Sequence, residues 1–97
     1  MTEAPDPAVV ELATKIFDLA RQGRTDALVA YVDAGVPASL TNDRGQTPLA
    51  GAVFKGETDV IKVLLEGGAD PSLGTPSAVD TARMFGKTDL LELFGAH

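Results

Sequence analysis

Residues 42–49, Asn-Asp-Arg-Gly-Gln-Thr-Pro-Leu, join a turn directly to the start of a helix. Glycine at position 45 supplies the backbone freedom of the turn, Thr47 is placed to cap the helix, and Pro48 fits its first turn. The stretch belongs to a block that recurs after 33 residues, in which Gly23, Thr25, Asp26, Gly35, Ser39 and Leu40 return as Gly56, Thr58, Asp59, Gly68, Ser72 and Leu73. A fixed period of this length predicts a stack of similar helical units.

Each copy of the block predicts a pair of helices separated by a glycine. The first pair starts at Asp6 and Pro7, because aspartate accepts the free N–H groups of a helix start and proline fits the first position. Helices are expected over about 7–22, 25–35, 47–55, 58–66 and 88–94. Helical spacing predicts the buried stripe of the first helix, which consists of Val9, Leu12, Ala13, Ile16, Leu19 and Ala20.

The third copy is shorter than the second. It is offset by 30 residues, so that Ala82, Gly86, Thr88, Asp89 and Leu91 match Ala52, Gly56, Thr58, Asp59 and Ile61. Irregular outer copies are expected at the ends of a stack, where a unit has only one neighbour. The predicted organisation is a single domain over 1–97, with an N-terminal capping repeat (8–40), a regular repeat (41–73) and a shortened C-terminal capping repeat (74–97).

Composition and charge exclude several classes of protein. A chain of 97 residues makes one domain, and its core must come from Leu, Val, Ile and Ala, since only 5% of residues are aromatic. The net charge of −6 repels nucleic acid and anionic membranes. The chain shows neither a membrane span nor a signal peptide, and without cysteine it has no disulfide or thiolate site. A cytoplasmic, all-α protein is expected.

The repeated block resembles the ankyrin repeat over roughly residues 10–94, and most closely from Asn42 to Ser72. The resemblance implies a solenoid of helix-turn-helix pairs with short β-turn fingers, in a protein that binds other proteins. The block departs from the family at Ala50, where a histidine usually ties the helix to the finger. Asp80 holds that position in the third copy, where it is expected to contact its own shortened connection. Gly51 indicates either a close approach between helices or a tolerated residue.

The resemblance also implies a concave binding surface, made by the finger and the exposed side of the first helix of each pair. On that surface lie Arg21 and Gln22, and the residues predicted to bind a partner are Asp43, Arg44, Gln46, Phe54, Lys55, Met84 and Phe85. Phe54, Met84 and Phe85 admit two interpretations. They form an exposed binding patch, or Met84 and Phe85 plug the C-terminal cap while Phe54 covers the gap left by the shortened finger.

No pattern of residues supports a catalytic, cofactor or metal site. The single histidine, His97, is the last residue, and no phosphate-binding or nucleophile motif is present. The prediction is a non-catalytic protein-protein interaction module, without a cofactor, that binds another protein and is a monomer or self-associates weakly. Two alternatives remain open: an inhibitor or regulatory subunit of one enzyme, and a small enzyme or metal protein that uses His97.

Overall fold

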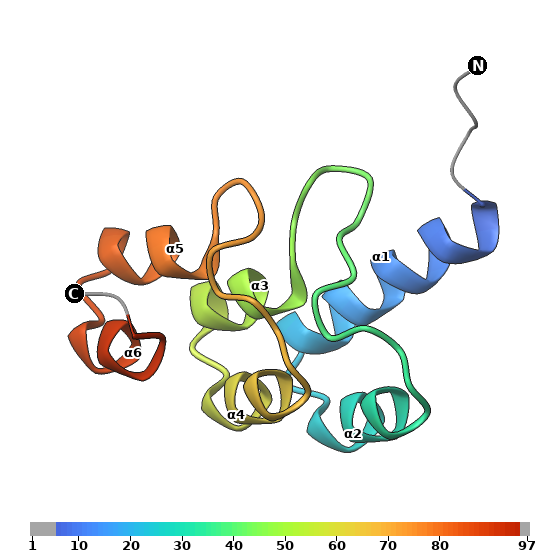
Figure 1. The fold of residues 1–97 in the computed structure, drawn as a ribbon, viewed down its shortest axis with the longest axis horizontal. Helices are drawn as coiled ribbons and strands as arrows, with labels where there is room; N and C mark the ends of the chain where they lie inside the picture. The colour runs from blue at the N-terminus through green and yellow to red at the C-terminus, as the bar shows by residue number, and fades with distance from the viewer. Residues whose placement is uncertain (1–5, 96–97) are drawn as a thin grey trace.

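The structure is a computed structural model that describes residues 6–95. Within this range it contains helices and no strands: α1 (Pro7–Arg21), α2 (Thr25–Asp33), α3 (Pro48–Lys55), α4 (Thr58–Glu66), α5 (Ala78–Met84) and α6 (Thr88–Leu93). Figure 1 shows two rows, with the inner helices α1, α3 and α5 in one and the outer helices α2, α4 and α6 in the other. The connections 34–47 and 67–77 project on the side of the inner helices. The predicted all-α fold is confirmed.

The inner helices begin where a side chain caps them. Oδ1 of Asp6 accepts a hydrogen bond from the backbone N of Ala8 at 2.9 Å, and Oγ1 of Thr47 accepts one from Ala50 at 3.2 Å. Ser77 does the same for α5. The outer helices lack a side-chain cap and instead carry an aspartate in the first turn, which the helix dipole stabilises. The predicted helix starts at Asp6 and Thr47 are confirmed.

Each inner helix turns back into its outer helix through the same hydrogen bond. The backbone N of the residue after the glycine donates to a carbonyl five residues earlier: Arg24 to Leu19, Glu57 to Ala52 and Lys87 to Ala82. The distances are 3.0, 2.9 and 2.9 Å. The three helical hairpins therefore share one turn geometry, as the period predicts.

The core lies between the two rows. Small residues bring the inner helices close together, and larger aliphatic side chains fill the space behind them; the largest fully buried hydrophobic side chains are Leu28, Leu49, Val53, Val60, Ile61 and Leu64. Tyr31 and Phe94 pack partly buried against this core. The prediction that Val9 is buried is wrong, since its side chain is 46% exposed. Figure 1 shows why: the first turns of α1 extend beyond the other helices.

Two long-range hydrogen bonds tie the second connection to the first. Oγ of Ser39 accepts from the backbone N of Asp70 at 2.8 Å, and the carbonyl of Gly45 accepts from the N of Thr75 at 3.1 Å. The carboxylate of Asp70 in turn accepts from the hydroxyl and the backbone N of Ser72, which lowers the pKa of Asp70. The connections are therefore fixed relative to each other beside the inner helices.

Candidate functional site

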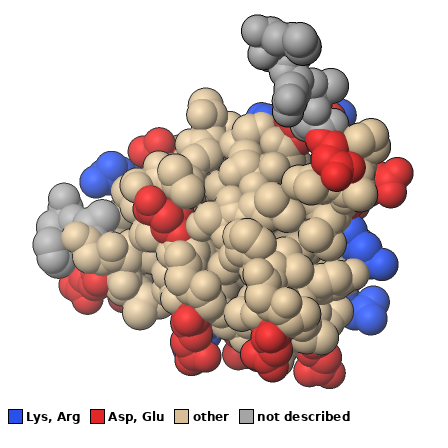
Figure 2. All heavy atoms as spheres, turned by 45° about the vertical axis from the view of Figure 1, so that its right-hand side comes forward, with Lys and Arg blue, Asp and Glu red and all other residues tan. Residues whose placement is uncertain are grey.

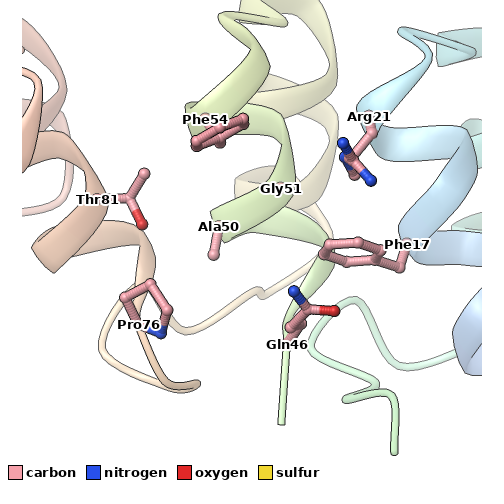
Figure 3. A pocket seen from close by; sticks show the side chains of 8 residues that line it. All are labelled: Phe17, Arg21, Gln46, Ala50, Gly51, Phe54, Pro76 and Thr81. Carbon is pink, nitrogen blue, oxygen red and sulfur yellow. The ribbon is translucent and has the colours of Figure 1, made fainter. Parts of the chain in front are cut away.

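The inner helices and the two connections enclose a hollow of about 310 Å³. We call this hollow the inner pocket. Figure 3 shows its eight lining residues, which come from α1 (Phe17, Arg21), the first connection (Gln46), α3 (Ala50, Gly51, Phe54), the second connection (Pro76) and α5 (Thr81). All three hairpins contribute to it, so the pocket exists only in the assembled stack.

Gly51 allows α1 to lie close to α3 at the floor of the pocket. A Cβ atom at this position would stand 2.9 Å from Cε1 of Phe17 and 3.0 Å from Cγ of Arg21. The Phe17 ring, which is buried, therefore occupies space that any other residue at position 51 would take. Of the two interpretations of Gly51, the close approach between neighbouring helices is the one that the packing supports.

Two polar side chains stand at the rim of the pocket. The guanidinium carbon of Arg21 lies 5.7 Å from the centroid of the Phe17 ring, within the range of a cation–π contact. The Oε1 atom of Gln46 accepts a hydrogen bond from Nδ2 of Asn42 at 2.9 Å. Figure 3 shows the Gln46 amide group pointing between Ala50 and Phe17.

Asn42 organises the first connection, a role that the sequence analysis missed. Its Oδ1 atom accepts from the backbone N of Arg44 at 3.0 Å and from that of Gln46 at 2.9 Å. Asparagine commonly bonds to its own backbone in turns, so the signal was present in the Asn-Asp-Arg-Gly stretch. These hydrogen bonds hold the connection within itself and do not tie it to α3.

Beside the pocket, Phe54, Met84 and Phe85 form an exposed group that we call the aromatic patch. Their side chains are 57%, 70% and 49% exposed. The rings of Phe54 and Phe85 meet edge to face, with centroids 5.5 Å apart. None of the three side chains plugs the core, and that they bind a partner stays a prediction. Phe54 belongs to both the patch and the pocket, so the two surfaces are continuous.

The other predicted residues lie around this surface. Gln46 and Phe54 line the pocket, whereas Asp43, Arg44 and Lys55 are exposed and do not line it. Gln22 lies along a shallower hollow on α1. The lining residues that the sequence analysis did not place in the site are Phe17, Ala50, Gly51, Pro76 and Thr81. These residues come from three different repeats, and no local sequence pattern predicts contacts between repeats.

The prediction that the Asp80 side chain contacts its connection is wrong, since only the backbone N of Asp80 does so, by donating to Oγ of Ser77 at 3.1 Å. The Asp80 carboxylate lies 3.8 Å from the guanidinium of Arg83, one helical turn away, and both side chains are more than half exposed. The i, i+3 spacing on α5 brings these charges together more readily than the connection does. Such an exposed ion pair adds little to stability.

Charged residues are distributed unevenly. The outer helices α2 and α4 carry exposed carboxylates at Asp26, Asp33, Asp59 and Glu66. Figure 2 shows acidic side chains along the lower edge, where Figure 1 places these helices, and others at the left and upper right of a surface whose centre is largely uncharged. Much of the chain's negative charge therefore lies away from the inner helices.

Within residues 6–95, no group of His, Asp or Glu side chains is arranged to hold a metal ion. In the same range no helix is long and apolar enough to cross a membrane. His97, the one residue on which the enzyme alternative depends, lies outside the described residues.

Because α1 and α3 lie so close at Gly51, we predict that the effects of Gly51→Ala and Phe17→Ala on stability are coupled. Gly51→Ala gains up to about 1 kcal/mol of helix propensity, but its methyl group collides with the Phe17 ring. We expect the substitution to give no gain, or a loss, in the wild type and to be more favourable in a Phe17→Ala protein, where the contact with Cγ of Arg21 remains. Urea denaturation of the four proteins measures the coupling. Equal effects of Gly51→Ala in the two backgrounds would contradict the packing argument.

Several curated proteins are similar to the chain, and three of them are named as ankyrin repeat proteins. An ankyrin repeat-containing protein of Schizosaccharomyces pombe is 34% identical over 55 residues, covering 57% of this chain and 27% of that protein. An ankyrin repeat domain-containing protein of Aspergillus oryzae is 33% identical over 82 residues, which cover 84% of this chain and 13% of that protein. A protein of Pseudomonas aeruginosa that is named as an ankyrin repeat protein is 36% identical over 67 residues, which cover 65% of this chain and 39% of that protein. The chain thus spans less than half the length of each relative.

No protein-family model matches the chain, and no solved structure matches it significantly. The likeness therefore comes from the curated relatives alone. It extends over much of the chain in the Aspergillus protein.

Proposed function

Because the chain belongs to the ankyrin repeat family, we propose that it is a non-catalytic module that binds another protein. The proposed binding surface consists of the inner pocket and the aromatic patch, with Asp43, Arg44 and Lys55 at its border. The division into two capping repeats around a regular one, a cytoplasmic location and a monomeric or weakly self-associating state belong to the same proposal.

The aromatic patch carries the proposal. Phe54, Met84 and Phe85 are large apolar side chains that stay exposed beside a hollow instead of joining the core. Scattered apolar residues are ordinary on protein surfaces, but two exposed aromatic rings that contact each other beside a pocket, with a methionine adjacent in sequence, are typical of a binding site. Aromatic and methionine side chains are also enriched in protein interfaces.

The patch is tested by the double variant Phe54→Asp, Met84→Asp. Buried aromatic anchors commonly contribute 2 kcal/mol or more to binding, so we expect the variant to lose about thirtyfold or more in affinity. An affinity pull-down from the source cell with both proteins, followed by titration of the captured partner, measures the loss. The partner's identity also decides whether the chain acts as the inhibitor or regulatory subunit of one enzyme.

Val29→Asp is the matched control, because Val29 is an exposed apolar residue on the outer helix α2. It places one such carboxylate on the opposite row of helices, and circular dichroism checks that all three proteins fold. Capture of every partner by Phe54→Asp, Met84→Asp as by the wild type would contradict the proposed surface.

A further inference from the structure

The rim of the inner pocket offers hydrogen-bond donors. Arg21 is the only ionisable residue among the described residues that line the pocket, and the one ion pair found within 6–95 joins Arg83 to Asp80. The Arg21 guanidinium therefore reaches the pocket without a carboxylate partner there.

The side-chain carbonyl of Gln46 already accepts a hydrogen bond from Asn42, so the Nε2 group of Gln46 is left to donate to a ligand. The hydroxyl of Thr81 already donates to the carbonyl of Ser77 at 2.8 Å.

The walls and floor of the pocket are apolar. Phe17 comes from α1 and Phe54 from α3, with Gly51 between the two rings and Ala50 next to it on α3 (Figure 3). A hollow of about 310 Å³ lies at the small end of the range of ligand sites, which suits a large side chain better than a whole folded element. An aromatic or long aliphatic side chain that entered it would contact both rings.

We propose that the inner pocket takes an apolar side chain from a partner protein whose neighbouring residue is Asp or Glu, with the carboxylate bound by Arg21 and Gln46. This inference rests on the proposed function and specifies the chemistry of its partner: a short acidic segment with an aromatic or aliphatic anchor. The planar guanidinium fork of Arg21 matches a carboxylate in two parallel hydrogen bonds.

The net charge of −6 does not prevent this binding. Exposed charges separated by more than about 8 Å are largely screened at physiological salt. Exposed acidic side chains lie on the outer helices α2 and α4 and also on the inner side, at Glu11 and Asp18 of α1, Asp43 of the first connection and Asp80 of α5, which pairs with Arg83. None of them lines the pocket, whereas Arg21 does, so a carboxylate bound there contacts the guanidinium directly.

The probe for this inference is a phage-displayed library of random peptides, selected on the folded wild-type chain. We expect the enriched peptides to share Asp or Glu within two positions of an aromatic or aliphatic residue. The binding of a selected peptide is then measured by fluorescence polarisation with the wild type and with Arg21→Gln. We expect a loss of roughly three- to tenfold with Arg21→Gln, and a weaker effect of salt on the affinity of this variant.

A peptide in which the acidic residue is replaced by its amide completes a double-mutant cycle with Arg21→Gln. The two changes are expected to be non-additive, because each removes the same contact. Arg24→Gln is the matched control, since Arg24 is exposed and does not line the pocket. It should bind the selected peptide as the wild type does.

The inference would be overturned if no peptide is enriched, if the enriched peptides lack acidic residues, or if Arg21→Gln and the amide peptide act additively. The proposed function fails separately, when the pull-down partners bind Phe54→Asp, Met84→Asp as tightly as the wild type. If the binding of a partner depends on Phe54 and Met84 but not on Arg21, the proposed function holds and only the inference of an acidic segment is contradicted.

Discussion

Leu64→Ala is expected to lower the free energy of unfolding by about 3 to 5 kcal/mol. The Leu64 side chain is fully buried in α4, where the two rows of helices meet. Its truncation removes apolar contacts and leaves a cavity that the rigid helices cannot fully close. Domains of this size are stable by roughly 5 to 15 kcal/mol, so one substitution removes about a fifth or more of the total.

Leu93→Ala is the control for this prediction. Leu93 has the same side chain on the outer helix α6, but it is 55% exposed. We expect its loss to cost less than about 1 kcal/mol. Urea denaturation followed by circular dichroism measures both variants. Similar losses for Leu64→Ala and Leu93→Ala would show that the core does not lie where the structure places it.

Gly74→Ala is expected to cost about 2 to 4 kcal/mol. Gly74 has φ +96°, and a Cβ atom would stand 3.0 Å from Cγ2 of Thr47 and 3.3 Å from the carbonyl oxygen of Gly45. A side chain there meets backbone strain and a collision with the first connection. Moving away would weaken the hydrogen bond between Thr75 and Gly45.

Gly68→Ala separates the two causes. Gly68 has nearly the same φ, +93°, but open space where the Cβ atom would lie. We expect it to cost about 1 to 2 kcal/mol, from the backbone conformation alone. The difference between the two variants, measured by thermal or urea denaturation, gives the contribution of the packed connections. Equal losses would show that the connections do not contact each other in solution.

The sequence predicts most of the fold because its signals are local. Asp6 and Thr47 cap helices through bonds to residues two or three positions away, and the glycine-terminated hairpins repeat with the period. Val9 shows the limit of this reasoning. Helical spacing places it on the buried stripe, but burial needs a neighbouring helix, and α1 extends beyond its neighbours.

The pocket was predicted only in part. Gln46 and Phe54 were selected because the resemblance assigns their positions to a binding surface. Phe17 and Gly51 were not, since their contact joins helices from different copies and depends on how closely α1 and α3 approach. The prediction for Asp80 fails for the opposite reason, because its carboxylate contacts a local partner, Arg83, and not the connection that the repeat predicts.

The order of packing has a kinetic consequence. The inner helices pack in sequence, α1 against α3 and α3 against α5, while α2 packs against α4. Each junction joins segments about one block apart, and loop-closure entropy changes slowly with loop length, so no junction is strongly favoured to form first. Contacts of such short separation favour rapid folding. The hairpin of α3 and α4 takes part in the junctions on both sides, so it belongs to whichever junction forms first.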